Sequence, residues 1–475
     1  MKMKITTAAL FLGALFACSN SNDSGAEVSL SITAESPFAL HEVHFNHPSE
    51  AAAVTDLGAK AARVAPYGSL VWDLIEKQKG VYDWSASDLV MTTGYGTGAQ
   101  LFVTASAQNS LEGTTPGTGQ LPKDMSWYLE FLKKAAERYD GDGRDDAPGS
   151  PKIDVIQIGN EVDGPAFWQD TPEHYALLLK ESYKAIKSVA PAIKVAMAGT
   201  ATPWGFHSFY KPVLAELNRL KDAPGDRYFD IFDLHWSGQF PGDNDYAAVT
   251  LDKTYELGAY IADVRGSLAA IGHDNVPVYI TEMSDYSDSP AGYPNHTESY
   301  HAAAVVKRYL YALSRGASKI FWAGIIEQHN FGGEVNGYFD NVGLINNALN
   351  SDGLSHKKLA YYTYKKMVEM LEGSDWKNIQ VINESGDLRV YKLDKNNKPV
   401  YAAWWDGYTP GAIKPVAITG LSGTTALTTG SVQYFARGAE VADYAAAFRT
   451  ESLPISSGTV TVSLGEAPVF VEVLQ

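Results

Sequence analysis

The chain has 475 residues, and its 55 acidic side chains outnumber its 38 lysines and arginines, which gives a formal net charge of −17. This charge argues against nucleic acid as a partner, because phosphate backbones need a basic face, and it disfavours a polyanionic substrate. The length is ample for one large domain and a second, smaller one. The single cysteine, Cys18, leaves no possibility of an intramolecular disulfide.

The N-terminus has the pattern of an export signal. Lys2 and Lys4 precede an apolar run from Ala8 to Ala17, which Cys18 follows. This run is shorter than the about 20 residues of a membrane-spanning helix, and it is typical of a secretory signal peptide. The segment 15–18, Leu-Phe-Ala-Cys, resembles a bacterial lipobox, which implies lipidation of Cys18 and anchoring in the cell envelope, at the outer membrane of a Gram-negative bacterium. The alternative is a plain signal peptide with an incidental cysteine.

We therefore predict a lipoprotein signal peptide over residues 1–18 and a polar tether over residues 19–36, whose beginning is rich in Asn, Ser, Asp and Gly. The lipid anchor is the only contact with a membrane that the sequence leads us to expect.

From residue 37 to residue 373, short apolar runs alternate with amphipathic stretches, which is typical of a parallel α/β fold. Helices are predicted at 124–139, 172–190, 247–271, 297–315 and 356–371, and the second has Thr171 as N-cap and Pro172 at its first position. Strands are predicted at about 39–45, 60–65, 99–105, 153–158, 193–198, 229–234, 276–281 and 318–323. Eight such units favour a closed (β/α)8 TIM barrel. No strand leads into a nucleotide-binding glycine motif, and no cofactor is expected.

The period changes near Ser374. Short alternating strands are predicted at 381–390, 400–405, 416–418, 431–435, 459–464 and 467–473, separated by Gly, Asn-Asn and Pro turns. Residues 374–475 are therefore predicted to form an all-β, sandwich-like domain. Because no flexible linker precedes it, we expect this domain to pack against the barrel.

Two of the predicted barrel strands end in a glutamate. The strand Ile153–Ile158 stops at Gly159 and leads into Asn160-Glu161, and the strand at 276–280 leads into Glu282. TIM barrels display catalytic groups at the C-terminal ends of their strands. The two glutamates are separated by three βα units of roughly 40 residues, which places them after the fourth and seventh strands, facing each other across the barrel mouth.

Motifs at several strand ends can be compared with those of known enzymes. Asn160-Glu161 matches the acid/base motif of clan A of the glycoside hydrolases, and Glu282 matches its nucleophile. The ends of the second, sixth and eighth strands resemble the same clan, through Arg63-Val64-Ala65-Pro66, Asp233-Leu234-His235-Trp236 and Phe321-Trp322. The nearest resemblance is to families thirty-nine and five. It implies a retaining glycosidase with a carbohydrate substrate, but it holds for the clan rather than for one family and implies no particular sugar.

The chemistry of retention explains why these residue types recur. One carboxylate attacks the anomeric carbon and another protonates the leaving oxygen, with the two groups about 5–5.5 Å apart. The resemblance makes Glu282 the nucleophile and Glu161 the acid and base. Asn160 would bind the 2-hydroxyl of the sugar, and Arg63 would keep Glu282 ionised. His235 would be a hydrogen-bonding member of the same cluster.

Each of these residues also has a purely structural explanation. The glutamates could be acids favoured at helix N-termini, Arg63 could bridge strand ends, and His235 could be a core histidine. Trp236 and Trp322 are predicted to stack on sugar rings, with core packing as the alternative.

Two further groups of residues could contact a ligand. His44 and Asn46, after the first strand, are predicted to contact sugar rather than metal, because no third ligand follows at a suitable spacing. The loop 140–146 resembles the start of a calcium site through Asp140, Asp142 and Asp146, but the acid that would complete such a loop is absent, and a solvated acidic turn is favoured.

The sequence therefore predicts a retaining hydrolase of β-glycosidic bonds. The alternatives are a surface lipoprotein that binds glycans without cleaving them and a structural envelope protein. The first would be expected to lack one of the two carboxylates, and the second gives no reason for both.

Overall fold

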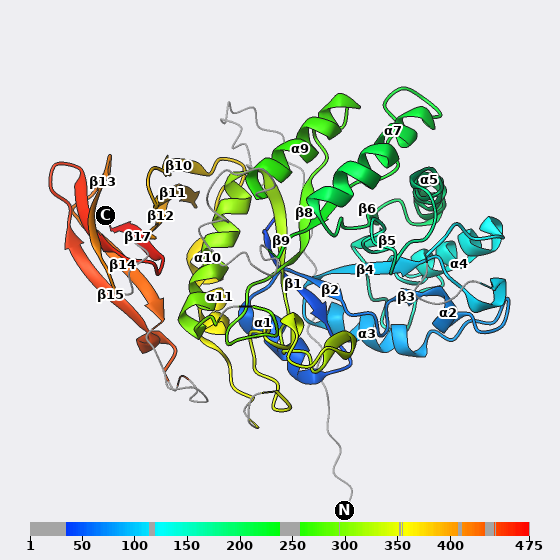
Figure 1. Cartoon of the computed structure of the whole chain (residues 1–475), viewed down its shortest axis with the longest axis horizontal. Helices are drawn as coiled ribbons and strands as arrows, with labels where there is room; N and C mark the ends of the chain where they lie inside the picture. Colours follow the sequence, from blue (N-terminus) through cyan, green and yellow to red (C-terminus); the bar gives the residue numbers. More distant parts are fainter. Residues whose placement is uncertain are drawn as a thin grey trace, which may run out of the picture. The chain divides into compact units, whose positions relative to one another are not determined.

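Eight parallel strands form a closed barrel (Figure 1). The computed structural model describes residues 35–113, 119–237, 257–293, 295–350, 353, 355–406, 411–432, 441 and 443–474. The neighbour order is β6-β5-β4-β2-β1-β9-β8-β7, and isolated bridges between Ala196 and Ile231 and between Thr200 and Leu234 join β6 to β7. The strands are β1 (Phe38–Val43), β2 (Ala61–Val64), β4 (Gln100–Ser106), β5 (Val155–Ile158), β6 (Lys194–Met197), β7 (Phe232–His235), β8 (Val278–Met283) and β9 (Ala317–Ala323), with the short β3 (Leu70–Val71) paired to β4.

Helices surround the barrel (Figure 1). Local signals set their ends: the Thr171 hydroxyl accepts a hydrogen bond from the backbone N–H of His174 at 3.2 Å, and Thr297 caps α10 in the same way. The helices are α1 (Pro48–Leu57), α2 (Trp72–Ile75), α3 (Ser85–Gly96), α4 (Met125–Arg138), α5 (Pro172–Val189), α6 (Pro203–Gly205), α7 (Lys211–Arg219), α9 (Leu257–Ala270), α10 (Glu298–Ser314) and α11 (Leu359–Leu371).

The interior of the barrel is layered because strand side chains alternate in direction. One apolar layer takes a side chain from each strand region: Ala39, Ala61, Phe102, Val155, Ala196, Ile231, Tyr279 and Phe321. Two residues further toward the C-terminal ends, the same parity gives the buried polar layer of His41, Arg63, Gln157, Asp233 and Thr281. The catalytic candidates therefore stand above a polar layer, which itself rests on an apolar one.

The C-terminal β domain is antiparallel. A six-stranded sheet has the order β10-β11-β12-β17-β14-β15, and β13 pairs with β16. Trp404 packs with the barrel core, and Lys307 of α10 forms a buried ion pair with Asp406 at 2.5 Å. The domain therefore packs against the barrel, as expected. Its strands are β10 (Gln380–Asn383), β11 (Leu388–Lys395), β12 (Lys398–Trp405), β13 (Lys414–Thr419), β14 (Thr425–Val432), β15 (Phe448–Pro454), β16 (Thr459–Leu464) and β17 (Val469–Leu474).

The predicted TIM barrel with a C-terminal β domain is confirmed, and all eight barrel strands overlap their predicted positions. The sequence did not predict helices α1, α2, α3, α6 and α7 or strands β3 and β15, and the predicted strand 381–390 is two strands, β10 and β11. The Asn-Asn turn that separates β11 from β12 has positive φ angles at Asn396 and Asn397, as a tight hairpin requires.

Residues 1–34 lie outside the described residues, and so do the predicted signal peptide, Cys18 and most of the tether. The predicted helical residues 247–256 also lie outside them. In the part of the chain that the structure describes, no helix is long and apolar enough to cross a membrane.

Candidate active site

The two glutamates reach the barrel mouth through irregular backbone at two strand ends. After β5 the chain turns sharply, with φ +78° at Gly159 and +40° at Glu161. At β8, Leu234 pairs with Ile280 whereas His235 pairs with Glu282, so β8 has one extra residue at this point. A β-bulge of this kind re-aims a side chain, and here it brings Glu282 beside the inward-facing Thr281.

Glu161, His235 and Glu282 converge at the mouth. One oxygen of each carboxylate and one ring nitrogen of His235 all lie within 4.8 Å of one another. Nδ1 of His235 is 2.8 Å from Oε1 of Glu161 and 3.4 Å from Oε1 of Glu282. The glutamate side chains are 23% and 20% exposed, respectively, whereas that of His235 is 4% exposed. The carboxylates are thus accessible and about as close as a retaining pair requires.

Arg63 connects the residues of the cluster. Its Nη1 donates to Oε1 of Glu282 at 2.7 Å, and its Nη2 donates to Oδ1 of Asn160 at 2.6 Å. Nη1 also lies 3.1 Å from Nδ1 of His41, and Nε and Nη2 donate to Oε1 of Gln157 at 3.1 and 2.8 Å. A single buried guanidinium therefore fixes the positions of Glu282 and of the amide next to Glu161.

Asp233 is the charged group beneath His235. Its Oδ2 accepts hydrogen bonds from Nε2 of Gln157 at 2.6 Å and from the Thr281 hydroxyl at 2.5 Å. Because that hydroxyl donates to Asp233, it can accept a bond from Nε2 of His235, which is 3.1 Å away. Both ring nitrogens of His235 then act as donors, toward Thr281 and toward Glu161, which is the bonding pattern of an imidazolium.

The electrostatics agree with this pattern. Burial disfavours the charge of His235, but Glu282, Asp233 and Glu161 outweigh burial and raise the pKa of His235 to about 10. Burial also opposes ionisation of Glu282, yet His235, His41 and Arg63 lower the pKa of Glu282 to about 2. For His41 burial prevails and lowers its pKa to about 3, so this ring is neutral and Nδ1 can accept from Arg63. The site therefore holds an ionised Glu282 beside two cations.

These contacts bear on metal binding. Oε1 of Glu282, which lies 3.4 Å from Nδ1 of His235, already accepts from Arg63, and the imidazolium of His235 repels a cation. The arrangement therefore favours a pair of reactive carboxylates over a metal-binding site.

His44 and Asn46 lie beside this cluster rather than within it. The backbone N–H of His44 donates to Glu50 at 2.8 Å, and the His44 ring lines a neighbouring cleft of about 600 Å³ with His47, Gln328 and other polar residues. Asn46 is half-buried in the turn before α1. The pairing register of β1 shifts between Leu40 and Val43, and it is His41 that contacts Arg63 and approaches Glu282, at 3.7 Å.

The two predicted sugar platforms differ in exposure. Trp322 is fully buried, with its ring centroid 6.0 Å from that of His301 and 6.2 Å from that of Tyr309, both on α10. Because Phe321 points into the barrel, Trp322 points outward under α10, and the expectation that its ring stacks on a sugar is corrected. Trp236 is half-buried, with the Arg308 guanidinium 5.2 Å from its ring centre.

The three aspartates of the acidic loop lie close together, as their spacing in the sequence suggested. One oxygen from each of Asp140, Asp142 and Asp146 lies within 4.8 Å of the others. Backbone N–H groups of the loop donate to these carboxylates, from Asp142 to Asp140 at 3.0 Å and from Gly143 to Asp146 at 2.8 Å. Such bonds are those of a solvated acidic turn as well as of a cation loop, and calcium at this loop stays a prediction.

The sequence interpretation assigned no role to Gln157 or Thr281 and named Asp233 only as part of a motif. A signal was present, because each is a polar residue inside an otherwise apolar strand, two positions beyond a residue of the apolar layer. The site also constrains the segment after β6: a Cβ atom added to Gly199 would lie 2.0 Å from Nε2 of His235 and 2.7 Å from Oδ2 of Asp233, so only glycine allows this approach.

Comparison with known proteins was made by sequence and by structure. No protein-family model matches the chain, and no curated protein matches it. A family 39 glycoside hydrolase from the gut symbiont Bacteroides cellulosilyticus WH2 superposes with a TM-score of 0.66 and 16% identity, over 92% of this chain and 80% of that one.

Two other solved structures are similar over nearly their whole length. The GH39 enzyme from Xanthomonas axonopodis pv. citri has a TM-score of 0.62 at 15% identity, covering 92% of this chain and 94% of that one. A monomeric beta-xylosidase from Caulobacter crescentus CB15 has the same TM-score and identity, covering 92% and 95%. At these identities the likeness shows that the chain shares the fold of these glycoside hydrolases.

Proposed function

We propose that the protein is a retaining glycoside hydrolase that cleaves β-glycosidic bonds of a poly- or oligosaccharide by double displacement. The observation that carries the proposal is the accessible pair Glu161 and Glu282, with oxygens within 4.8 Å of each other above a buried polar layer. This separation is shorter than the about 6.5–9.5 Å between the groups of an inverting pair, which supports a retaining mechanism. The fold shared with glycoside hydrolases also supports this reading.

In the first step, an oxygen of ionised Glu282 attacks the anomeric carbon, and the bond from that carbon to the leaving oxygen breaks. Protonated Glu161 gives its proton to the leaving oxygen, so the leaving group departs as an alcohol. Arg63 keeps Glu282 ionised and oriented for this attack, and the Asn160 amide, fixed by the same guanidinium, faces the 2-hydroxyl of the sugar.

In the second step, the Glu161 carboxylate takes a proton from a water molecule as that water attacks the anomeric carbon. The ester bond to Glu282 breaks and its carboxylate is restored. His235 donates to Glu161 and lies within 3.4 Å of Glu282, so its positive charge stabilises the negative charge as that charge passes from Glu161 to Glu282 in this step.

The glycone side of the substrate lies, in this proposal, toward the end of β1. Glu42 has a positive φ of +54° and is half-buried, and its pKa is raised by burial, with a side-chain hydrogen bond to Gln328 opposing that rise. Gln328 and His44 both line the cleft of about 600 Å³, which has room for a sugar ring and offers amide, imidazole and hydroxyl partners for its hydroxyl groups. Asn46 and the half-buried Trp236 are further proposed contacts.

We also propose that the protein is exported and lipid-anchored through Cys18, at the outer membrane of a Gram-negative bacterium. The support is the charged, apolar and cysteine-containing pattern of residues 1–18.

Reducing-sugar release from a panel of soluble β-linked glycans tests the activity, with Glu282→Gln as the matched control because the amide keeps the shape and removes the nucleophile. We expect release by the wild type on at least one glycan and none by the variant. Binding of a glycan by both proteins with release by neither would favour the alternative, a surface protein that binds glycans without cleaving them.

A further inference from the structure

The side chain of Lys319 places an ammonium group inside the barrel. It lies on β9 two residues before Phe321 of the apolar layer, so it points into the barrel toward the N-terminal ends of the strands. Its side chain is only 3% exposed. Lysine is almost never fully buried unless it is paired, and an apolar side chain would fill this place at a lower desolvation cost. A buried amine here therefore calls for an acidic partner.

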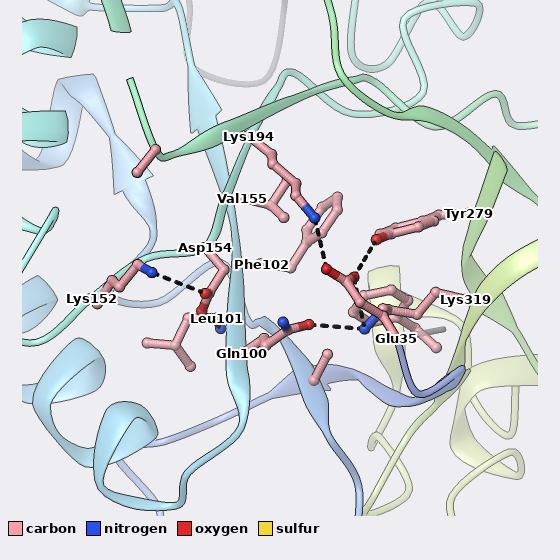
Figure 2. A pocket seen from close by; sticks show the side chains of 13 residues that line it. Glu35, Gln100, Leu101, Phe102, Lys152, Asp154, Val155, Lys194, Tyr279 and Lys319 are labelled. Carbon is pink, nitrogen blue, oxygen red and sulfur yellow. Dashed lines mark hydrogen bonds and ion pairs between the residues drawn. The ribbon is translucent and has the colours of Figure 1, made fainter. Parts of the chain in front are cut away.

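That partner is Glu35, which immediately precedes the segment leading into β1 (Figure 2). Nζ of Lys319 lies 3.9 Å from Oε2 of Glu35 and donates to Oε1 of Gln100 at 2.9 Å. Nζ of Lys194 lies 2.9 Å from Oε1 of Glu35, and the Tyr279 hydroxyl donates to Oε2 at 3.4 Å. Two ammonium groups and a phenol, from three different strands, converge on one carboxylate.

These groups line a cavity of about 250 Å³, which we call the floor pocket; Glu35, Gln100, Lys194, Tyr279 and Lys319 are its polar groups used here (Figure 2). Burial lowers the pKa of Lys319 to about 8, and Glu35 opposes that fall. Burial acts to raise the pKa of Glu35, but Lys194, Lys319 and Tyr279 together lower it. Glu35 and Lys319 thus favour each other's charged form.

The other acid of the floor pocket does not replace Glu35. Oδ2 of Asp154 accepts a hydrogen bond from the backbone N–H of Leu101 at 3.0 Å, and its Oδ1 faces Lys152 at 3.7 Å. Without Glu35, the pocket would hold three lysines against one carboxylate.

We propose that the floor pocket is a carboxylate-binding site. The chain's own Glu35 occupies it and thereby fixes the segment before β1 to the N-terminal end of the barrel, a contact that we call the clasp. The clasp fixes the point at which the N-terminal segment joins the barrel. This point is at the opposite end of the barrel from the mouth, where Glu161 and Glu282 lie. The site is independent of the proposed hydrolase activity.

The test is whether a free carboxylate can replace the missing side chain. Glu35→Ala should lower the melting temperature, and acetate at constant ionic strength should recover most of that loss in the variant while leaving the wild type unchanged, because a ligand that binds only the folded state raises its stability. Glu35→Gln is the matched control: it removes the charge but fills the space, so it should be destabilised without responding to acetate. The double variant Glu35→Ala/Lys319→Met should not respond either.

Hydrogen exchange separates the site from the clasp. In Glu35→Ala the amides of Ser36 and Phe38 should exchange faster, and acetate should restore the melting temperature without restoring their protection, since it does not reattach the segment. An equal acetate effect in all variants, or no loss of melting temperature in Glu35→Ala, would overturn the proposal. A stronger rescue by phosphate than by acetate would overturn the assignment to carboxylates. Melting and exchange do not depend on turnover, so a failed hydrolase assay leaves this test intact.

Discussion

Arg63 and Glu282 form an ion pair of 2.7 Å between Nη1 and Oε1, although 219 residues separate them in the chain. The pair joins β2 to β8 inside the barrel, and Arg63 is 5% exposed, so water screens this interaction little. It is one of the causes that lower the pKa of Glu282 to about 2, although burial acts in the opposite direction. The carboxylate proposed as nucleophile is therefore ionised throughout the physiological pH range.

Removing this nucleophile should abolish turnover with every leaving group. Glu282→Ala cannot form a glycosyl-enzyme, so even activated aryl β-glycosides should be hydrolysed only at background rate. Azide should enter the vacated space and give the α-glycosyl azide. The product anomer, read by NMR, checks this prediction.

Glu161→Ala should instead separate the two steps. An activated phenol needs little protonation, so the first step should survive, while the glycosyl-enzyme accumulates for lack of a base. Mass spectrometry should detect the intermediate, and azide should restore turnover and give the β-glycosyl azide. The same product anomer from both variants, or inversion by the wild type, would show that the roles of Glu161 and Glu282 are wrongly assigned.

Asp233 should act through His235 rather than on the substrate. Asp233→Asn weakens the electrostatic support of the imidazolium, so we expect kcat to fall roughly 10- to 100-fold while KM changes little. A loss of this size is typical when a residue that orients a functional side chain is removed. The alkaline limb of the pH–rate profile should also move to lower pH, because His235 loses its proton more easily. Asp222→Asn, which removes the charge of a half-exposed carboxylate paired with Lys180 and Lys184 of α5, is the matched control and should change neither quantity.

The pH dependence of stability should reflect the loss of the positive charge of His235. Its pKa rises from an ordinary 6.5 to about 10 in the folded protein, so its contribution is complete below pH 6.5 and is lost as pH rises through 10. The contribution of Glu282, whose pKa falls from 4.5 to about 2, is present above pH 4.5 and is lost as pH falls through 2. The difference in melting temperature between wild type and His235→Gln should therefore be largest near pH 5–6.5 and shrink toward pH 10. A difference that grows with pH would contradict it.

The predicted anchor can be tested by fractionation. If Cys18 is acylated, the protein should partition into detergent with the membrane fraction, and Cys18→Ser should release it to the soluble fraction with its activity retained. Stable attachment requires more than one acyl chain, because a single chain binds only marginally. Soluble secretion of the unmutated protein would contradict the anchor, and Ser19→Ala, which keeps the cysteine, is the control.

The sequence alone determined the order of the eight barrel strands and the positions of the longest helices. Local information sufficed, because apolar runs, caps such as Thr171-Pro172 and the breaks after strands act within a few residues of the chain. It also located Glu161 and Glu282 at two strand ends, since the end of a parallel strand in a barrel has a known place in space. Helices such as α1 and α3 were not predicted, although α1 has Pro48 at its start and Gly58 after its end.

Only the tertiary structure decided which side chains share a layer inside the barrel. Gln157 meets Arg63 and Asp233, and Lys319 meets Glu35, across sequence separations that no local pattern encodes. The same geometry directs Trp322 outward beneath α10 and brings His41 rather than His44 to the catalytic cluster. The physical reason is that barrel closure and a shift of register by one residue set the direction of each side chain, and both depend on how strands pair rather than on the residues of one strand.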